Sequence, residues 1–408
     1  MGFELRRYRK PDMGEREILI VGAGLGAVRV AAQLRQRGYR GPITVLGAEP
    51  HLPYDRPPLS KQVLRGERDT TAFPDLDRLD VRWVLGTRAV SLDVGLNRVL
   101  ADDGQAYGYD VLVLAPGGRA RTLPGLEIGS GLHVLRTIDD ALSLRESIRT
   151  SGRLIVIGAG FIGCEIAASA RQIGSNVDLI EALPAPIVRV LGPRAASKVA
   201  DLHEAHGVRL HAGAAVAEIV RGPEGRVRGV RLGDGSLVDG NDVVVGIGIF
   251  PSVDWLAESG VELQDGIVCD SSGRTSVPNV FALGDAAQWW HDLVGKHRRV
   301  EHWTTTADQA AVVAATIVQD QTEAPAELHA APYFWSDQYD VKIQGIGFID
   351  PSDHVDELSI RDRTVFLYSR DGVVRGVVGF SIPGAVMRTK PLIERGAPVT
   401  EVFDLLTA

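Results

Sequence analysis

The chain has 408 residues, a formal net charge of −8 at pH 7 and 45% hydrophobic residues. This length exceeds what one hydrophobic core usually supports, so two or three domains are expected. The acidic balance argues against general nucleic-acid binding, and the presence of only two cysteines excludes a disulfide-stapled secreted framework.

The N-terminal segment carries a basic run before the first strand-like segment. No apolar stretch typical of a secretion signal follows it, so we interpret the run as a disordered tail. The longest apolar stretch, residues 154–170, contains Glu165 and several glycines, which makes it unsuited to a membrane span. A soluble, cytoplasmic protein is therefore expected. The basic run consists of Arg6, Arg7, Arg9 and Lys10.

Residues 18–49 and 154–181 repeat one pattern at an offset of 136 positions along the glycine motif. Each copy begins with a β-branched run that ends in Gly-x-Gly-x-x-Gly/Ala. An alanine-rich segment of helical character follows, and a second apolar run then ends at an acid, Glu49 in the first copy and Glu181 in the second. The repeat predicts two β-α-β units of the same design.

The spacing of the repeat suits dinucleotide binding. The first glycine permits a tight turn, the second lets the backbone approach a pyrophosphate, and the third small residue lets helix and strand pack closely. The phosphates then lie at the helix N-terminus, and the acid can accept hydrogen bonds from ribose hydroxyls. One such motif would be weak support, but two complete copies predict two dinucleotide sites.

Two further strand-like runs lie outside the repeat. Residues 109–121 lead directly into the second copy, and residues 275–287 contain Gly284 and Asp285 at the end of an apolar run. An acid at such a strand end can bind a polyol chain. The alternative is a turn residue that caps the following helix.

Seven short segments of the sequence carry a resemblance to a known family. The segments are VGAGLGA, YDRPPLSK (54–61), APGGRAR, IGAGFIGCE, VGIGIFP (245–251), TSVPNVFALGD and YFWSDQ (333–338). Together they are similar to the FAD-dependent NADH:ferredoxin reductases that serve bacterial Rieske oxygenases and cytochromes P450. The resemblance implies an α/β fold with two Rossmann-like dinucleotide-binding domains, of the glutathione-reductase-like type, and a C-terminal α+β domain.

The same resemblance implies domain boundaries. The FAD-binding domain would comprise residues 1–117 and 246–322, and the NADH-binding domain would interrupt it at 118–245. The C-terminal domain would comprise residues 323–408. Residues 322–332, rich in Pro, Ala and Glu, are independently typical of a linker.

Carried over position by position, the resemblance also implies site residues. Relatives often have Asp where this chain has Ala48, so Glu49 would hold the FAD ribose alone or through a shifted backbone. The FAD site would comprise Gly22, Gly24, Gly26, Ala27, Glu49, Arg56, Lys61, Ala89, Arg136, Asp285 and Trp303. The NADH site would comprise Gly158, Gly160, Phe161, Ile162, Gly163, Glu165, Glu181, Gly246, Ile247 and Gly248.

Three residues are expected to act on the chemistry, and no metal is expected. Lys61 follows the rigid pair Pro57-Pro58, which can aim its ammonium at a buried ring. Glu165 lies at the start of the second repeat's helix and can pair with Lys61. Trp303 begins a threonine-capped, alanine-rich helix, where it can stack near the nicotinamide or simply fill the core.

The cysteines indicate the kind of electron acceptor. Disulfide reductases need two cysteines beside the flavin, whereas Cys164 and Cys269 lie far apart in sequence. An external one-electron carrier is therefore expected, and the resemblance implies a small iron–sulfur ferredoxin. We expect it to dock on the basic run Lys296, His297, Arg298 and Arg299, although such a run can also be an incidental surface hairpin.

Two alternatives remain open from the sequence. An NADH oxidase or quinone-type reductase would pass the electrons to oxygen or to a small quinone. A redox sensor similar to apoptosis-inducing factor would signal through its NADH complex rather than turn over. The chain contains no long basic insert that would support the second alternative.

Overall fold

A computed structural model describes residues 16–125, 127–319 and 326–408, which form two compact units. The first unit is drawn from Met1–Tyr54, Ala72–Gly117 and Pro251–His329. The second is drawn from Asp55–Thr71, Gly118–Phe250 and Ala330–Ala408. The basic run at residues 6–10 and the boundary expected at residue 323 lie outside the described residues.

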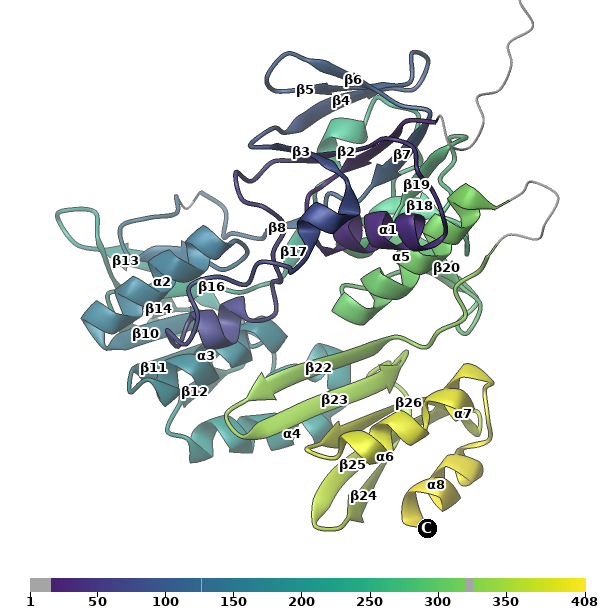
Figure 1. Ribbon diagram of the computed structural model, residues 1–408. Coiled ribbons are helices and arrows are strands. Elements are labelled where there is room, and N and C mark those ends of the chain that lie inside the picture. Colours follow the sequence, from purple (N-terminus) through teal and green to yellow (C-terminus); the bar gives the residue numbers. More distant parts are fainter. Residues whose placement is uncertain (1–15, 126, 320–325) are drawn as a thin grey trace, which may run out of the picture. The chain divides into compact units, whose positions relative to one another are not determined.

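A five-stranded parallel sheet forms the centre of the first unit (Figure 1). Every residue of β1, β2, β7 and β19 is buried, as in parallel sheets that are covered on both faces. The chain leaves β1 toward β2 on one side, and β7 lies on the other, so the carboxyl end of β1 is a topological switch point. The order is β19 (Val280–Ala282), β7 (Val111–Leu114), β1 (Ile18–Val21), β2 (Ile43–Gly47), β3 (Arg82–Leu85).

Two helices and two small sheets complete this unit. Helix α1 (Leu25–Gln36) packs against α5 (Trp303–Val318). One small sheet joins β4 (Ala89–Asp93), β5 (Arg98–Ala101) and β6 (Ala106–Gly108), and the other joins β18 (Ile267–Cys269), β20 (Ala287–His291) and β21 (Lys296–Arg299). Short helical turns lie at η3 (Leu76–Leu79), η4 (Asp254–Leu256) and η5 (Gly284–Ala286).

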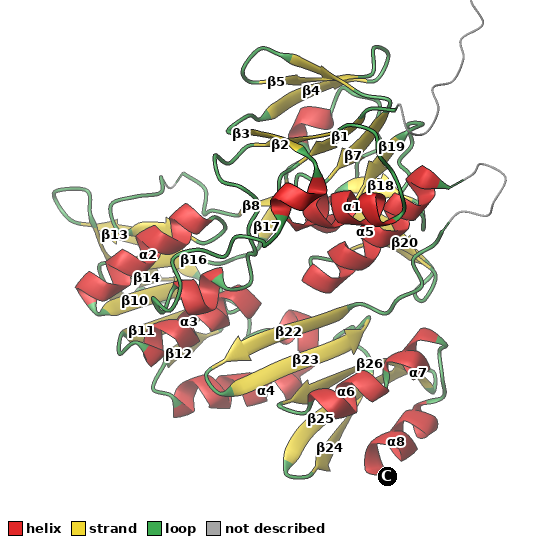
Figure 2. Cartoon of the chain, in the orientation of Figure 1, coloured by secondary structure: helices red, strands yellow, loops and turns green. Residues whose placement is uncertain are grey.

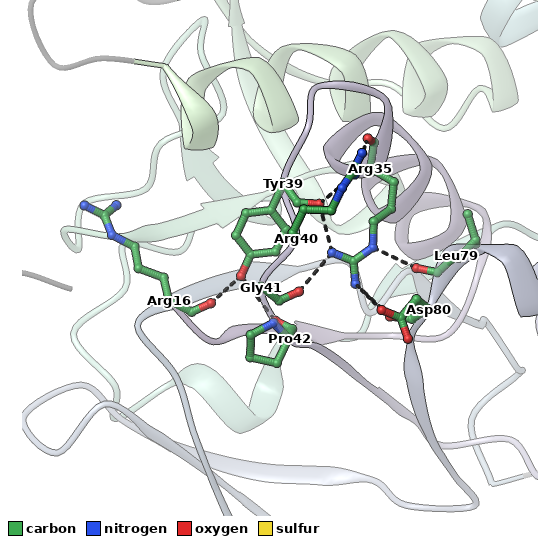
Figure 3. A network of polar contacts seen from close by, with 8 residues as sticks. All are labelled: Arg16, Arg35, Tyr39, Arg40, Gly41, Pro42, Leu79 and Asp80. Atoms are coloured by element: carbon green, nitrogen blue, oxygen red, sulfur yellow. Dashed lines mark hydrogen bonds and ion pairs between the residues drawn. The ribbon is translucent and has the colours of Figure 1, made fainter. Parts of the chain in front are cut away.

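Arg35, in the last turn of α1, holds the surrounding loops together (Figure 3). Its Nε donates to the Leu79 carbonyl at 2.9 Å, and its Nη groups donate to the Gly41 and Asp80 carbonyls at 2.9 and 2.7 Å. Its guanidinium also lies 5.6 Å from the centre of the Tyr39 ring. One charged side chain therefore fixes the loop between α1 and β2 against the segment that leads to β3.

A second five-stranded parallel sheet forms the centre of the other unit. Helix α2 begins with a capping box: the Thr137 hydroxyl accepts from the Asp140 N–H, and the Asp140 carboxylate accepts from the Thr137 N–H. The strand order is β12 (Arg209–Ala212), β11 (Asn176–Glu181), β10 (Arg153–Ile157), β16 (Val243–Val245), β9 (Leu132–Val134). The helices are α2 (Ile138–Ser151), α3 (Phe161–Gln172) and α4 (Val188–Ala205).

Smaller elements surround this sheet. A π-helical turn, η2 (Leu59–Val63), follows Pro57-Pro58. β8 (Gly118–Ala120) pairs with β17 (Ile249–Pro251), and a three-stranded antiparallel sheet comprises β13 (Val216–Arg221), β14 (Val227–Leu232) and β15 (Leu237–Asp239).

The C-terminal part of the second unit is an antiparallel sheet with three short helices (Figure 2). Its core is continuous with that of the parallel sheet, because Phe334, Phe366 and Tyr368 belong to the same buried cluster as Leu154 and Ile166. The strands are β22 (Tyr333–Gln338), β23 (Val341–Gly347), β26 (Val373–Phe380), β25 (Arg363–Arg370) and β24 (His354–Ile360) in spatial order. The helices are α6 (Pro383–Arg388), α7 (Lys390–Glu394) and α8 (Val399–Thr407).

Both strand–turn–helix repeats that the sequence predicts are present. The prediction that a threonine caps helix α5 is wrong. The helix begins at Trp303 with His302 at the cap position, so the threonines lie inside its first turns. Thr306 instead donates its hydroxyl to the His302 carbonyl at 3.2 Å. Within the described ranges, no helix is long and apolar enough to cross a membrane.

Candidate active site

In the first glycine motif, the second glycine has free space on its Cβ side, whereas the first glycine has none. A Cβ on Gly22, whose φ is +108°, would lie 2.0 Å from the Ala115 carbonyl oxygen, so this position requires glycine. A Cβ on Gly24 would meet no described atom within 4 Å. A Cβ on Gly26 would lie 3.1 Å from the Ala115 Cβ, and the neighbouring Ala27 is fully buried. The motif therefore packs tightly at its first and third glycines and is open at the second.

The second glycine motif repeats this division. A Cβ on Gly158, whose φ is +96°, would lie 2.5 Å from the Gly246 carbonyl oxygen, and one on Gly163 would lie 1.9 Å from the Gly158 carbonyl oxygen. A Cβ on Gly160 would meet no described atom within 4 Å. Open space at the second glycine, at a helix N-terminus, is what a pyrophosphate requires. Both motifs thus fit a dinucleotide.

The two predicted ribose acids lie at matching positions just beyond, or at the end of, the second strand of each repeat. Glu49 follows β2 and accepts a hydrogen bond from the Tyr54 hydroxyl at 2.5 Å. Glu181 ends β11, and its two oxygens accept from the Ala159 N–H at 2.7 Å and the Leu183 N–H at 2.9 Å. Glu181 therefore holds the glycine turn in place while its remaining lone pairs stay available to ribose hydroxyls.

The segment around Asp285 places polar groups beyond the end of β19. Asp285 lies in η5, and Gln309 of α5 accepts from the Gly284 N–H at 2.8 Å. The Gln309 Nε2 and the Arg29 Nε are buried and have no hydrogen-bond partner among the described residues. Arg29 also lies over the Trp303 ring, 4.9 Å from its centre. Buried donors of this kind fit a bound ligand that is rich in acceptors.

Lys61 and Glu165 form a buried ion pair within the second unit. The Lys61 Nζ lies 2.6 Å from the Glu165 Oε2, and the two residues are 5% and 3% exposed. Lys61 also donates to the Pro57 carbonyl at 3.1 Å, so the turn that precedes η2 orients its side chain. Ser60 donates to the same carboxylate oxygen at 2.5 Å, and Ser336 donates to the Oε1 at 2.8 Å. The pairing expected from the sequence is present in the structure.

The predicted FAD set is divided between the two units. Arg56 donates to the Arg136 carbonyl, and Arg136 donates through Nε to the Gly118 carbonyl at 2.9 Å, all within the second unit with Lys61. Ala89 begins β4 in the first unit and is buried. The remaining FAD residues also belong to the first unit.

The predicted NADH set lies together around the carboxyl ends of β10 and β16. Phe161 contacts Phe334, with ring centres 5.1 Å apart. Ile162 is 46% exposed and Ile247 is 38% exposed, which leaves apolar side chains accessible beside the open glycine turn. The Gly248 carbonyl, at the end of the Gly246–Gly248 loop, accepts from the Arg121 N–H at 2.9 Å. An accessible apolar rim beside a phosphate-binding turn suits a nicotinamide dinucleotide.

The cysteines cannot form a dithiol relay. Cys164, in α3, is fully buried, and burial raises the pKa of its thiol well above the ordinary value. Cys269, in β18, is also buried, and burial raises the pKa of its thiol. Both are free thiols and belong to different units of the fold. Neither has the accessible, low-pKa character of a reactive cysteine.

The basic run forms strand β21, and its members differ in exposure. The Lys296 side chain is exposed at the hairpin end of the strand. The Arg299 side chain is only 8% exposed, where it pairs with Asp265 and Glu301 and donates to the Asp285 carbonyl at 3.1 Å. Arg299 therefore stabilises the segment around Asp285.

Several residues of the sites were not singled out from the sequence. Tyr54, Ser60 and Ser336 lie inside the motifs YDRPPLSK and YFWSDQ, so the motifs located them without indicating their contacts. Arg29 and Gln309 lie in ordinary helical patterns, and no signal in the sequence distinguishes them. Their contacts depend on how α1 and α5 pack together.

Comparison with known proteins gives consistent matches over most of the chain. Residues 16–310 match the pyridine nucleotide-disulphide oxidoreductase family, and residues 333–403 match the reductase C-terminal family. The chain is 37% identical to a ferredoxin–NAD(P)(+) reductase of a Sphingomonas species, over 81% of each chain. It is also 37% identical to a rubredoxin–NAD(+) reductase of Pseudomonas putida, over 86% of this chain and 91% of the relative.

A solved structure matches over nearly the full length. It is the reductase in a covalent putidaredoxin reductase–putidaredoxin complex, with a TM-score of 0.89 and 28% identity, covering 96% of this chain and 99% of the other. The expected fold class is therefore confirmed, and so are the cofactors FAD and NAD(H). The chain belongs to the pyridine nucleotide-disulphide oxidoreductase family, and within it to the FAD-dependent, NAD(H)-linked ferredoxin reductases.

Proposed function

We propose that the protein oxidises NADH and delivers electrons singly to a small iron–sulfur ferredoxin, which in turn supplies an oxygenase or a cytochrome P450. Bound FAD supplies the conversion of a two-electron hydride into single-electron transfers. The residues present fit this cofactor, because the first glycine motif is open at Gly24 and buried donors lie unpartnered nearby. The domain boundaries at residues 117, 245 and 323 remain part of the proposal.

The observation that carries the proposal is the buried Lys61–Glu165 pair. A buried ion pair is costly unless both charges are well satisfied, and here the carboxylate accepts three hydrogen bonds. Glu165 is the fifth residue of α3, close behind the glycine turn that would hold the NADH pyrophosphate. In this proposal the Lys61 ammonium faces the flavin ring, where a positive charge favours electron uptake.

Each glycine turn would bind one nucleotide. The N-terminus of α1 and Glu49 would hold the pyrophosphate and ribose of FAD, while Asp285 would bind its polyol chain. The N-terminus of α3 and Glu181 would hold the same groups of NADH. Trp303, held by the guanidinium of Arg29, would stack near the nicotinamide.

The acceptor follows from the cysteines and from the relatives. Both cysteines are buried, and burial raises the pKa of each thiol, so neither is suited to pass electrons to a disulfide substrate. The names of the relatives refer to ferredoxin and rubredoxin, and the solved complex contains putidaredoxin. These names support a small one-electron protein carrier as the partner.

We also propose that the partner docks beside strand β21. Lys296 provides the accessible charge, and Arg298 lies partly exposed on the same strand. Arg299 was included in the expected docking set, but its ion pairs support a structural role better than a docking role.

The function is tested by anaerobic mixing of the flavin-loaded protein with NADH and a purified [2Fe–2S] ferredoxin. We expect NADH to bleach the flavin and the ferredoxin to be reduced in repeated turnovers. Oxygen consumption without ferredoxin should be at least about tenfold slower. Rapid oxygen or quinone reduction with no transfer to any ferredoxin would instead support the oxidase alternative.

A further inference from the structure

A chain of buried polar side chains extends the Lys61–Glu165 pair into the C-terminal sheet. The Gln338 Nε2 lies 3.2 Å from the Ser336 Oγ, and the Gln338 Oε1 lies 3.1 Å from the His203 Nε2. The His203 Nδ1 lies 3.0 Å from the Tyr339 hydroxyl. All members belong to the second unit. In order, the chain is Lys61, Glu165, Ser336, Gln338, His203 and Tyr339.

The chemistry of Glu165 fixes the direction of every bond in this chain. A carboxylate only accepts, so the Ser336 hydroxyl must donate to it, and the Ser336 oxygen then accepts from the Gln338 NH₂ group. The Gln338 carbonyl oxygen accordingly faces His203 and accepts from its Nε2–H. The His203 Nδ1 is left as the acceptor for the Tyr339 hydroxyl. Every donor thus points toward Glu165.

The surroundings of these hydrogen bonds keep His203 in one protonation state and one tautomer. Ser336, Gln338 and His203 are all 0% exposed. Burial lowers the pKa of His203 to about 4, although the hydrogen bond that its Nε2–H donates to Gln338 acts in the opposite direction, so the imidazole is neutral at pH 7. The Tyr339 ring stacks on His206, with centres 3.7 Å apart and planes 8° apart. Only one tautomer of His203 satisfies all of these partners.

This chain of hydrogen bonds is suited to orienting the Glu165 carboxylate rather than to transferring a proton. An amide passes a proton only by changing its own tautomer, so Gln338 interrupts any relay between His203 and Glu165. The negative charge of Glu165 is instead shared among three donors, two on the turn η2 and one on strand β22. The Glu165 Oε1 is held by Ser336, and the Oε2 by Lys61 and Ser60. Lys61 is therefore relieved of part of the carboxylate charge.

We propose that Ser336, supported by Gln338 and His203, is a positioning residue that sets the electric field of Lys61 at the flavin. The proposal rests on the proposed function in placing Lys61 beside the flavin. It assigns the C-terminal sheet a role in tuning electron uptake, through the Ser336 and Gln338 side chains of β22. Loss of the Ser336 hydroxyl would leave the carboxylate with only Lys61 and Ser60 as donors, so more of its negative charge would offset the positive field of Lys61.

The test compares Ser336→Ala with Ser336→Thr, which keeps a hydroxyl, and with Ser369→Ala as the control. Ser369 is a buried serine of β25 outside the chain of hydrogen bonds. The flavin midpoint potential is measured by dithionite titration against a reference dye, so this measurement does not require NADH. Flavin reduction by NADH is then followed anaerobically by stopped flow.

For Ser336→Ala we expect a tenfold shift of the redox equilibrium against reduced flavin, about 30 mV for a two-electron couple. The rate of flavin reduction should fall by about tenfold at unchanged KM for NADH. Ser336→Thr should recover both quantities, Gln338→Leu should shift them in the same direction by less, and Ser369→Ala should match the parent protein.

An unchanged potential in Ser336→Ala, or an equal shift in Ser369→Ala, would overturn the proposal. Failure of the proposed function has a different signature, because the parent protein would then show no flavin reduction by NADH. The dithionite titration would still compare the variants in that case.

Discussion

Glu181 shows how one residue can both build a site and select its ligand. Its carboxylate accepts from the Ala159 and Leu183 N–H groups, so its negative charge is fixed at the edge of the nucleotide turn. A carboxylate at this position can accept from a ribose 2′-hydroxyl but repels a 2′-phosphate. The residues that follow it, Ala182, Leu183 and Pro184, provide no cation.

We therefore predict that kcat/KM for NADH exceeds that for NADPH by at least about tenfold, which requires only about 1.4 kcal/mol of discrimination. Steady-state reduction of ferricyanide with each nucleotide measures this ratio without a ferredoxin. Equal kcat/KM values for the two nucleotides would show that Glu181 does not face the 2′ position.

At the scale of elements, each glycine turn assigns separate roles to its glycines. The first glycine must be glycine because of its positive φ and the carbonyl beside it, whereas the second has open space on its Cβ side. The protein itself therefore tolerates a methyl group at Gly24 or Gly160, and only a ligand would be affected.

We predict that Gly160→Ala folds normally but binds NADH at least about tenfold more weakly, because the methyl group would occupy the space for the pyrophosphate. Flavin content should stay unchanged, since the other turn is intact. Gly158→Ala is the matched comparison: it should impair folding, because its Cβ would lie 2.5 Å from the Gly246 carbonyl oxygen. Unaltered NADH affinity in Gly160→Ala would place the nucleotide elsewhere.

His203 gives the contact between α4 and the turn after β22 a pH dependence. Its pKa in the folded protein is lowered to about 4 from an ordinary value near 6.5, so the unfolded chain binds more protons between these values. The stability that His203 contributes is complete above pH 6.5 and is lost as the pH falls toward 4, by about 3 kcal/mol in total.

Thermal unfolding of the parent protein and of His203→Gln, measured between pH 7 and pH 4.5, tests this prediction. The parent protein should lose stability more steeply with acid than the variant. Parallel curves would mean that His203 does not titrate with unfolding in this range.

The elements show what could be predicted from the sequence and what could not. The glycine turns and the acids of the repeats were predictable because a positive φ, a close backbone approach and a strand-end acid all leave local signals. Ser336, Gln338 and His203 could not be assigned roles, because the contacts that define these roles join positions far apart. Ser336 and Glu165 are 171 positions apart, and Gln338 and His203 are 135 positions apart. Arg299 was read as a surface charge for the same reason: Asp265, 34 positions earlier, neutralises it.

For the whole molecule, the net charge of −8 makes any local basic patch important for an acidic partner. Complementary charge mainly raises the rate of encounter and is screened over about 8 Å at physiological ionic strength. Lys296 is the exposed charge of the proposed docking strand β21. It lies at the hairpin end, opposite His291 in the register of β20 and β21. Reversal of this charge should affect the partner and spare small acceptors.

We predict that Lys296→Glu slows ferredoxin reduction by about threefold at low salt, with the difference vanishing at high salt. Ferricyanide reduction should be unchanged. Lys198→Glu, an exposed charge reversal on α4, is the control and should have no effect on either acceptor. Arg299→Glu should lower both activities, because it breaks the contacts that hold the Asp285 segment. Identical salt dependence in Lys296→Glu and the parent protein would place docking on another face.

In the proposed function, the two electrons of a hydride from NADH leave the protein one at a time. The most direct measurement is the anaerobic stoichiometry of the reaction, with limiting NADH and an excess of oxidised [2Fe–2S] ferredoxin, followed by the bleaching of the cluster. We expect two ferredoxins to be reduced for each NADH oxidised, and FAD to be the only flavin released on denaturation. A protein that oxidises NADH without reducing ferredoxin, or that releases FMN or no flavin, would contradict it.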